Sequence, residues 1–291
     1  IMMRLTGTRG KFMYLICEEG KGPLSEENLW YDGGTAKLYL QDQLLYKIYE
    51  KPEPHRRAVL DILIQNHTLR DVGVLPKKKI KTTSGKYGLV MNYIDGSVTF
   101  RQYLKNKQVP LERMISILII LSDNLKRINQ EGIHFSDLHH NNILIKKDGY
   151  PLFIDFDDAV VEPYSSHHIC RIAHELHEVK EKGFDYEGDL IRWGNLDREC
   201  LFIMLLDYLI DDYVERYSYS KFNALVKLFS TDFPEDFMKA ISQLKAKGKE
   251  ILPFPYFVGD FLKNPEVRKG CDRIRRRVRY ADNRLKDGKC L

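Results

Sequence analysis

The most informative part of the chain consists of two segments, FSDLHHNNILI at residues 135–145 and FIDFDDA at 153–159. Asp137 and Asn142 are five residues apart, and Asp155 follows thirteen residues later inside an apolar run. Strand-like apolar residues follow the first group and precede the second, so two short strands can bring these side chains together. Two carboxylates and one amide would then converge where oxygen ligands can hold a divalent cation beside a polyphosphate.

The composition is that of an ordinary globular protein. Of the 291 residues, 43% are hydrophobic and 30% are charged, and apolar runs such as ILIILS at 117–122 are far shorter than the roughly 20 residues of a membrane span. The beginning of the chain lacks the long apolar segment of a cleavable secretory signal. Five cysteines without paired spacing indicate reduced thiols. These features favour a cytoplasmic protein with no transmembrane segment.

The first third of the chain predicts a small sheet and one helix. Residues 29–49 mix aromatic and alternating apolar residues with turn signals, which predicts three short antiparallel strands. Apolar residues at helical spacing after a proline predict a helix over 54–66. YGLVMNYIDG at 87–96 predicts a buried strand that runs into a turn.

The remainder of the chain predicts mainly helices. FRQYL at 100–104 can begin one helix, and the apolar period over 111–130 predicts a long helix that ends at Gly132. LDRECLFIMLLDYLIDDY at 196–213 is apolar nearly all round, which predicts a helix in the middle of a lobe with Asp197 near its start.

Taken in order, these segments resemble the protein kinase superfamily from about Tyr31 to Tyr208. The kinase signature has an Asp, a Leu, three spacers and an Asn, followed by the metal-binding Asp of the DFG segment, and the counterparts here are Asp137, Asn142 and Asp155. The resemblance implies that Asp137 accepts or orients the proton of an acceptor hydroxyl. It implies that Asn142 and Asp155 hold Mg²⁺, or Mn²⁺, against the phosphates of ATP.

The resemblance also implies a fold. It is a bilobal α+β kinase fold, with a small antiparallel-sheet lobe and hinge at residues 1–94 and a larger, mainly helical lobe at residues 95–291. ATP would bind between the two lobes.

Within the first lobe, Lys47 in LLYKIYE resembles the kinase lysine that pairs the α- and β-phosphates, although a solvated strand lysine fits the same pattern. Gly33 and Gly34 resemble a shortened glycine-rich loop, or form only a turn. Met91 resembles the residue that precedes the hinge, and its neighbours would bind adenine through their backbone, unless this is only a core strand. The implied nucleotide-binding residues are Gly33, Gly34, Lys47, Met91, Asn92, Tyr93 and Ile94.

The chain departs from the kinase pattern at several positions. The HRD motif keeps only its aspartate, because Phe135 and Ser136 replace its first two residues, so a phosphorylated activation loop has no obvious receiver. Asp157 replaces the glycine of DFG, and either adds a carboxylate to the metal site or stiffens the turn. The helix that should offer Lys47 a glutamate has none, which leaves Asp61 or Glu53 as substitutes.

Other polar residues have two interpretations each. Asp197 resembles the buried aspartate that braces the kinase catalytic loop, but it could be a helix N-cap. His139 and His140 could touch phosphate or acceptor, or one could pack against the neighbouring loop. His167, His168, His174 and His177 could form a metal site, but ordinary polar residues are the better interpretation because no Cys or carboxylate completes the set.

These features predict an ATP-dependent Ser/Thr protein kinase with a protein substrate. The nearest resemblance is to compact bacterial protein kinases, including effectors secreted into a host cell. The strings DLHHNNIL and IDFDDA also resemble aminoglycoside and choline kinases, so a small-molecule phosphotransferase is one alternative. A nucleotide-binding pseudokinase scaffold is another.

Residues 268–289 hold ten Lys or Arg and three Asp, whereas the whole chain has a net charge of +5. This basic segment could bind an acidic partner, an anionic lipid or an inositol phosphate, although a solvated basic helix is the default. It lacks regularly interleaved aromatic residues, so specific nucleic-acid binding is not favoured.

Overall fold

A computed structural model describes residues 15–16, 24, 26–33, 35–51, 54–106, 108–135, 137–161, 186–244 and 254–286 of the protein. This part of the chain is a mixed α/β structure and divides into two compact units, residues 1–96 and residues 97–291. They are called the N-terminal unit and the C-terminal unit below.

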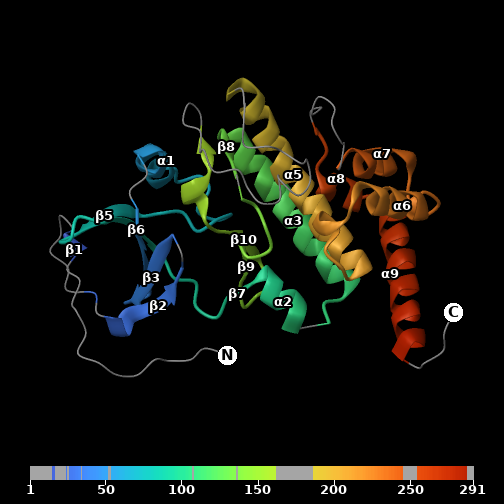
Figure 1. Ribbon diagram of the computed structural model, residues 1–291, viewed down its shortest axis with the longest axis horizontal. Coiled ribbons are helices and arrows are strands. Elements are labelled where there is room, and N and C mark those ends of the chain that lie inside the picture. Colours follow the sequence, from blue (N-terminus) through green and yellow to red (C-terminus); the bar gives the residue numbers. More distant parts are fainter. Residues whose placement is uncertain are drawn as a thin grey trace. The chain divides into compact units, whose positions relative to one another are not determined.

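The N-terminal unit is built on one antiparallel sheet with the strand order β1-β5-β6-β4-β3-β2 (Figure 1). Its strands are β1 (Leu15–Ile16), β2 (Leu29–Asp32), β3 (Ala36–Gln41), β4 (Leu44–Tyr49), β5 (Lys78–Thr82) and β6 (Tyr87–Asn92). The three strands predicted within residues 29–49 are confirmed as β2, β3 and β4. Helix α1 (Pro54–Gln65) follows them, in agreement with the helix predicted over 54–66.

The turn between β3 and β4 sets the register at the centre of this sheet. Gln41 pairs with Leu44, which leaves a two-residue loop at Asp42 and Gln43, with φ angles of 51° and 61°. Two positive φ angles in such a loop match the right-handed twist of the flanking strands. The resulting register carries Lys47 into the middle of the sheet, between β3 and β6.

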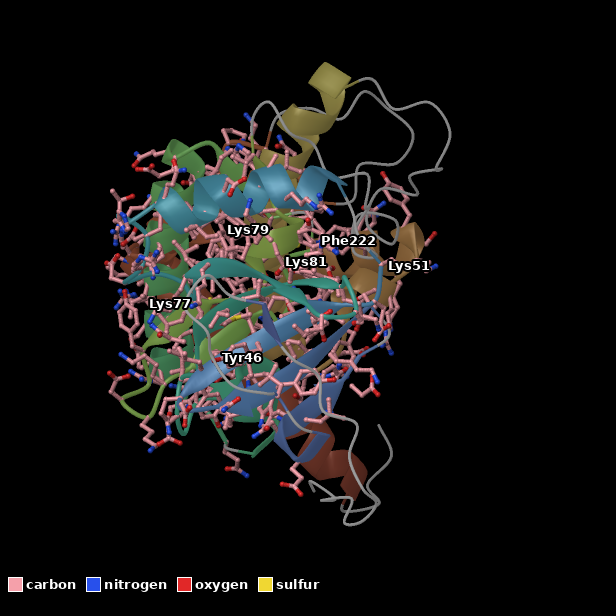
Figure 2. All side chains as sticks on the ribbon, turned by 90° about the vertical axis from the view of Figure 1, so that its left-hand side faces the viewer. Tyr46, Lys51, Lys77, Lys79, Lys81 and Phe222 are labelled. Carbon is pink, nitrogen blue, oxygen red and sulfur yellow. The ribbon has the colours of Figure 1, made fainter. Side chains whose placement is uncertain are left out.

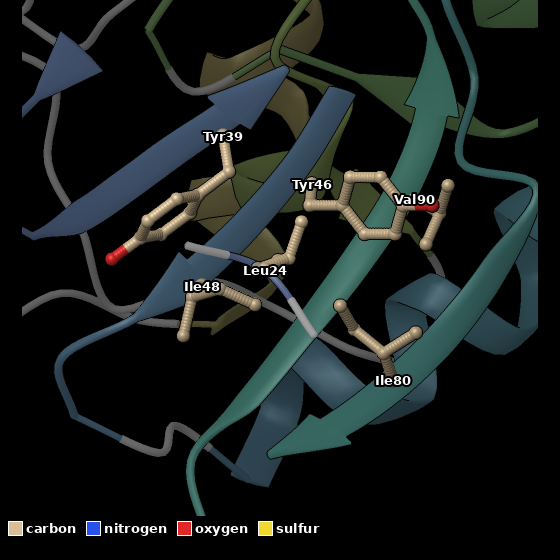
Figure 3. Packing of buried hydrophobic residues seen from close by; sticks show 6 residues of the cluster. All are labelled: Leu24, Tyr39, Tyr46, Ile48, Ile80 and Val90. Atoms are coloured by element: carbon tan, nitrogen blue, oxygen red, sulfur yellow. The ribbon is translucent and has the colours of Figure 1, made fainter. Parts of the chain in front are cut away.

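Alternation along the strands gives the sheet two apolar faces. One face is a cluster of Leu24, Tyr39, Tyr46, Ile48, Ile80 and Val90 (Figure 3). The other face carries Ala36, Tyr49 and Leu89, and Leu60 of α1 packs on it. Because successive strand residues point to opposite faces, Lys47 lies on the same face as Tyr49, toward α1.

Two long helices, α3 (Leu111–Gln130) and α5 (Tyr186–Ile210), pack against each other in the C-terminal unit (Figure 1). Helix α3 has the predicted bounds. It ends before Gly132, whose φ of 69° suits the left-handed position that follows a helix. The other described helices of this unit are α2 (Phe100–Asn106), α6 (Tyr219–Phe229), α7 (Glu235–Gln243), α8 (Val258–Leu262) and α9 (Pro265–Lys286).

Helix α5 begins earlier than the sequence predicts. The apolar pattern places its start near residue 196, whereas the backbone is helical from Tyr186. The first turns contain Gly188 and Gly194, which lower helix propensity and hide the helical period from a sequence pattern. The N-cap interpretation of Asp197 is therefore wrong, because Asp197 lies well inside the helix.

Short strands that follow α3 flank the loop at residues 137–142, and one strand from before α3 pairs with them. One small sheet has the order β10-β9-β7, from β7 (Val98–Thr99), β9 (Ile143–Ile145) and β10 (Pro151–Phe153), and a second pairs β8 (Ile133–His134) with β11 (Val160–Val161). The short 3-10 helix η2 (Phe156–Asp158) precedes β11, and another, η3 (Val214–Arg216), follows α5. The segments singled out in the sequence therefore lie at the end of a β-hairpin.

The basic helix α9 uses part of its charge to dock on its neighbours in the C-terminal unit. Arg273 Nε lies 3.1 Å from Asp232 Oδ1, and Arg277 also pairs with this buried carboxylate. Arg268 Nε donates to the backbone oxygen of Leu262 at 2.6 Å. By contrast, the side chain of Arg276 is 78% exposed. The predicted binding of an acidic partner, anionic lipid or inositol phosphate would rest on such exposed residues and stays a prediction.

Candidate active site

The β9–β10 hairpin brings Asn142 and Asp155 to the same end of the small sheet. Ile143 of β9 pairs with Phe153 of β10, so the residues just outside the pair face each other. The Ile154 N–H donates to the Asn142 backbone oxygen at 2.9 Å, which extends the ladder by one bond. Asp155 is the next residue after this bond. Local hairpin pairing therefore explains why these two residues meet.

Asn142 holds the loop that begins at Asp137. Its Nδ2 donates to the Asp137 backbone oxygen at 2.7 Å, and its N–H donates to the His139 oxygen at 2.9 Å. A carbonyl oxygen only accepts hydrogen bonds, so the contact with Asp137 fixes which end of the Asn142 amide is the nitrogen. The other end, Oδ1, can then act as an acceptor. The side chain is buried, at 8% exposure. Asn142 thus fixes the loop and retains one oxygen for a ligand.

Asp155 has an unusual backbone conformation, with φ 68° and ψ 45° in the left-handed region. Few residues other than glycine, asparagine and aspartate adopt this region without strain, and strained backbone often accompanies functional sites. Asp155 directly precedes η2, where Asp157 is almost completely buried at 2% exposure. Burial favours the interpretation of Asp157 as a turn residue.

The oxygens of Asn142 and Asp155 suit Mg²⁺ because this ion prefers carboxylate and carbonyl oxygen and usually keeps several waters. Their placement across one hairpin end fits a cation that takes few protein ligands. The described residues contain no group of three or more His, Cys, Asp and Glu side chains that could hold a metal. The four histidines at 167, 168, 174 and 177 lie outside the described residues.

Phe135, two residues before Asp137, is the centre of an aromatic cluster. Its ring centroid lies 5.2 Å from that of Phe153 and 4.7 Å from that of Phe156. All three rings are fully or almost fully buried. Phe156 directly follows Asp155, so apolar packing couples the two ends of the site. Ser136 lies outside the described residues.

Asp197 connects α5 to the same loop. It is completely buried, and its Oδ2 accepts the Phe135 N–H at 2.8 Å. Burial raises the pKa of Asp197 well above its usual value, since an ionised carboxylate loses its hydration. This contact agrees with the brace interpretation of Asp197, and it joins residues 62 apart in the sequence.

A pair of substitutions at Asp197 tests this brace. Asp197→Leu leaves the buried Phe135 N–H without an acceptor, so we expect a loss of about 1–3 kcal/mol in the free energy of unfolding. Asp197→Asn keeps a carbonyl oxygen and needs no charge, which suits a carboxyl whose neutral form is favoured. We expect it to stay close to the wild type in urea unfolding. Equal stability of the Leu and Asn variants would contradict the brace.

The two histidines of the loop have different surroundings. His139 Nδ1 accepts the Asn141 N–H at 3.1 Å, which leaves Nε2 as the nitrogen that can donate, and Nε2 lies 3.4 Å from Asp137 Oδ2. His140 stacks on Phe100 with ring centroids 5.7 Å apart. Burial lowers the pKa of His140 to about 4, and this ring is neutral at pH 7. His139 therefore orients Asp137, whereas the ring of His140 packs against Phe100.

A pocket of about 300 Å³ opens at this loop, entirely within the C-terminal unit. Its polar lining includes Arg101, Asp137, His139, Asp207, Tyr213 and Arg216. The candidate catalytic carboxylate thus lines a cavity of the size at which small-ligand sites begin. Sequence reasoning missed Arg101, Asp207, Tyr213 and Arg216, because each belongs to a helix, loop or turn without a recognisable motif.

In the N-terminal unit, several predicted nucleotide-binding groups already have partners. The Gly33 N–H donates to the Ala36 oxygen at 3.0 Å, and the Tyr93 N–H donates to the Gln43 oxygen at 3.0 Å. A Cβ atom at Gly33 would lie 3.0 Å from the Ala36 oxygen, so a larger residue would crowd this hairpin. A phosphate or adenine role for these two N–H groups would need the existing bonds to open. Gly34 lies outside the described residues.

Lys47 and Met91 lie on the α1 face of the sheet. The Lys47 ammonium is 5.6 Å from the centre of the Tyr49 ring, and Met91 packs against the cluster that contains Tyr49 and Leu89. The buried guanidinium of Arg56, from α1, lies 4.4 Å from the same tyrosine ring. Helix α1 therefore presents an arginine beside the strand that carries Lys47.

The substitute carboxylate proposed for Lys47 has another partner. Asp61 of α1 lies 2.6 Å from Lys79 Nζ, and Figure 2 shows Lys79 on β5 beneath this helix, between Lys77 and Lys81. This pairing across α1 and β5 weakens the interpretation of Asp61 as the partner of Lys47. The other candidate, Glu53, lies outside the described residues.

No helix in the described parts of the chain is both long and apolar enough to cross a membrane. Comparison of the sequence with models of known protein families and with curated proteins found no match.

Proposed function

We propose that the protein is an ATP- and Mg²⁺-dependent phosphotransferase with a bilobal kinase-like fold, which transfers the γ-phosphate to a hydroxyl group. The observation that carries this proposal is the loop at residues 137–142. The amide of Asn142 fixes the carbonyl of Asp137 and keeps its Oδ1 as an acceptor, the backbone of Asn142 pairs with the residue before Asp155, and Asp137 lines a pocket. These are the groups that phosphoryl transfer needs, a positioned carboxylate and oxygen ligands for a cation.

Each residue has a role in the proposed mechanism. Asp137, oriented by His139, accepts the proton of the acceptor hydroxyl, while Asn142 and Asp155 supply oxygen ligands. Lys47 would pair with the α- and β-phosphates. Bound Mg²⁺ would supply neutralisation of the negative charge on the β- and γ-phosphates. The protein contributes positioning and electrostatic stabilisation, and no covalent intermediate on the enzyme is required.

Two classes of acceptor fit this mechanism. The kinase resemblance favours the Ser or Thr hydroxyl of a protein. The pocket of about 300 Å³ at Asp137 favours the second candidate, a small-molecule hydroxyl, because a small-molecule acceptor is held in a cavity of this kind.

Transfer of labelled γ-phosphate from ATP tests the proposal. The protein is incubated with Mg²⁺ or Mn²⁺ and with generic protein acceptors, aminoglycosides, choline and simple polyols. We expect label in an acceptor with the wild type and none with Asp155→Asn. Label in protein Ser or Thr would assign the first class, and label in a small molecule the second. ATP binding without transfer to any acceptor would argue for a pseudokinase.

A further inference from the structure

The pocket at Asp137 is lined by elements that are far apart in the sequence. Helix α2 contributes Arg101, the catalytic loop contributes Asp137 and His139, and the segment after α5 contributes Tyr213 and Arg216. An apolar wall comes from α5, through Cys200, Ile203 and Met204. All of these elements belong to the C-terminal unit, so the shape of the pocket is fixed by one compact body.

Positive charge gathers around Tyr213 in this pocket. The Arg101 guanidinium lies 5.8 Å from the centre of the Tyr213 ring, and that of Arg216 lies 4.8 Å from it. Arg101 Nη2 also approaches the Tyr213 hydroxyl at 3.5 Å. The Arg101 Nε is buried and has no hydrogen-bond partner among the described residues. A buried guanidinium nitrogen without an acceptor is costly, and an anion would satisfy it.

The other charged groups of the pocket are used by the protein itself. Asp207 is buried, and its Oδ1 accepts the Val214 N–H at 2.7 Å, which holds the start of η3. Its Oδ2 makes no hydrogen bond among the described residues and lies 3.9 Å from His140 Nε2. The ring of His140 stacks on that of Phe100, with ring centroids 5.7 Å apart. Asp137 is assigned to the acceptor hydroxyl. Arg101 and Arg216 are then the groups that can favour an acceptor with a negative charge.

We propose that this pocket binds a small hydroxylated anion, such as a polyol phosphate or a hydroxy acid, with Arg101 and Arg216 at its anionic group and Asp137 at its hydroxyl. The proposal rests on the phosphotransferase function proposed above. In the reaction, the hydroxyl O–H bond breaks and its proton passes to Asp137. The oxygen forms a bond to the γ-phosphorus of ATP, and the bond between that phosphorus and the β–γ bridging oxygen breaks to release ADP.

The dimensions of the pocket and the chemistry of its walls support a small anion. A volume of about 300 Å³ lies at the lower end of the range for small-molecule sites. The planar fork of arginine suits phosphate and carboxylate, which it can bind through two parallel N–H bonds. The apolar wall on α5 would contact the carbon skeleton of the ligand. Aminoglycosides and choline are cations, so these two arginines would repel them.

Equilibrium binding without ATP tests the pocket independently of catalysis. Calorimetry compares glycerol 3-phosphate with glycerol and glucose 6-phosphate with glucose, for the wild type, Arg101→Gln and Arg216→Gln. We expect the wild type to prefer the phosphorylated member of each pair. Loss of charge-assisted hydrogen bonds should weaken binding of the phosphorylated compounds by about 10- to 100-fold in Arg101→Gln. The effect should be smaller in Arg216→Gln, because Arg216 is more exposed. Arg70→Gln, which replaces an exposed arginine of the N-terminal unit, serves as the matched control and should bind like the wild type.

A second experiment measures transfer from labelled ATP to the same pairs of neutral and phosphorylated acceptors. It distinguishes failure of the anion site from failure of the proposed phosphotransferase function. We expect the arginine variants to raise KM for the phosphorylated acceptor while KM for ATP stays unchanged, which a folding defect would not reproduce. Equal binding of neutral and phosphorylated members would overturn the anion site even if transfer occurs. Transfer only to acidic Ser- or Thr-containing peptides would overturn the small-molecule class. If no acceptor is labelled, the proposed function fails, and the binding comparison still decides whether the pocket selects anions.

Discussion

Asp137→Asn is expected to lower the rate of phosphoryl transfer by about 10²- to 10⁴-fold, the range for loss of a general base. Asparagine keeps the size of the side chain but cannot accept the hydroxyl proton. The bond from Asn142 to the backbone oxygen of Asp137 does not involve the altered group, so the loop should keep its shape. ATP binding should therefore remain close to that of the wild type. Single-turnover transfer and equilibrium ATP binding measure the two effects separately.

The matched control for this substitution is Asp148→Asn, on the turn between β9 and β10. Asp148 is exposed and pairs with Lys146 at 3.2 Å, away from the pocket lining. Its Oδ1 accepts the Tyr150 N–H, and an asparagine oxygen can do the same. We expect wild-type transfer from this control. Wild-type turnover in Asp137→Asn would show that Asp137 does not act on the acceptor.

Substitution of Asp155 should separate the charge of this residue from its backbone conformation. The φ angle of 68° at this position is tolerated by asparagine and glycine. Alanine in the same left-handed conformation should lower the free energy of unfolding by about 1–2 kcal/mol. We expect Asp155→Ala to unfold at lower urea concentration than Asp155→Asn or Asp155→Gly. All three variants lack the carboxylate, so all three should lose the Mg²⁺-dependent part of ATP binding and nearly all transfer.

Two measurements on the same three proteins check this expectation. Urea unfolding gives the stability order, and titration of ATP with and without Mg²⁺ gives the contribution of the cation. If Asp155→Asn keeps the Mg²⁺ dependence of the wild type, Asp155 is not a metal ligand. If Asp155→Ala is as stable as Asp155→Gly, the left-handed backbone is not a constraint at this position.

Local patterns predicted most of the elements that position the candidate site. The period of α3 and its terminal glycine, the helix at 54–65 and the strands between residues 29 and 49 were all visible in the sequence, because periodicity and turn residues act over short distances. Asn142 and Asp155 meet for the same reason, since a single hairpin joins them. The start of α5 was misplaced because its two glycines mask the helical pattern.

Contacts between distant segments were decided by tertiary packing. The bond from Phe135 to Asp197 spans 62 residues, and the contact of Arg101 with Tyr213 spans 112. Asp61 was a candidate partner of Lys47 in the sequence, but packing of α1 on the sheet places it at Lys79. No spacing rule encodes such pairs, because they depend on how helices and loops dock.

The sequence by itself indicated Asp137, Asn142 and Asp155 as the residues of the candidate phosphotransfer site. Asn142 and Asp155 flank strands that pair locally, β9 and β10. Only the tertiary structure decided what surrounds Asp137. The two arginines, the tyrosine between them and the apolar wall of α5 reach that carboxylate from segments remote in the chain. The physical reason is that the burial and the electrostatic potential of a pocket depend on every residue packed around it in space. A sequence motif contains only residues that are neighbours along the chain.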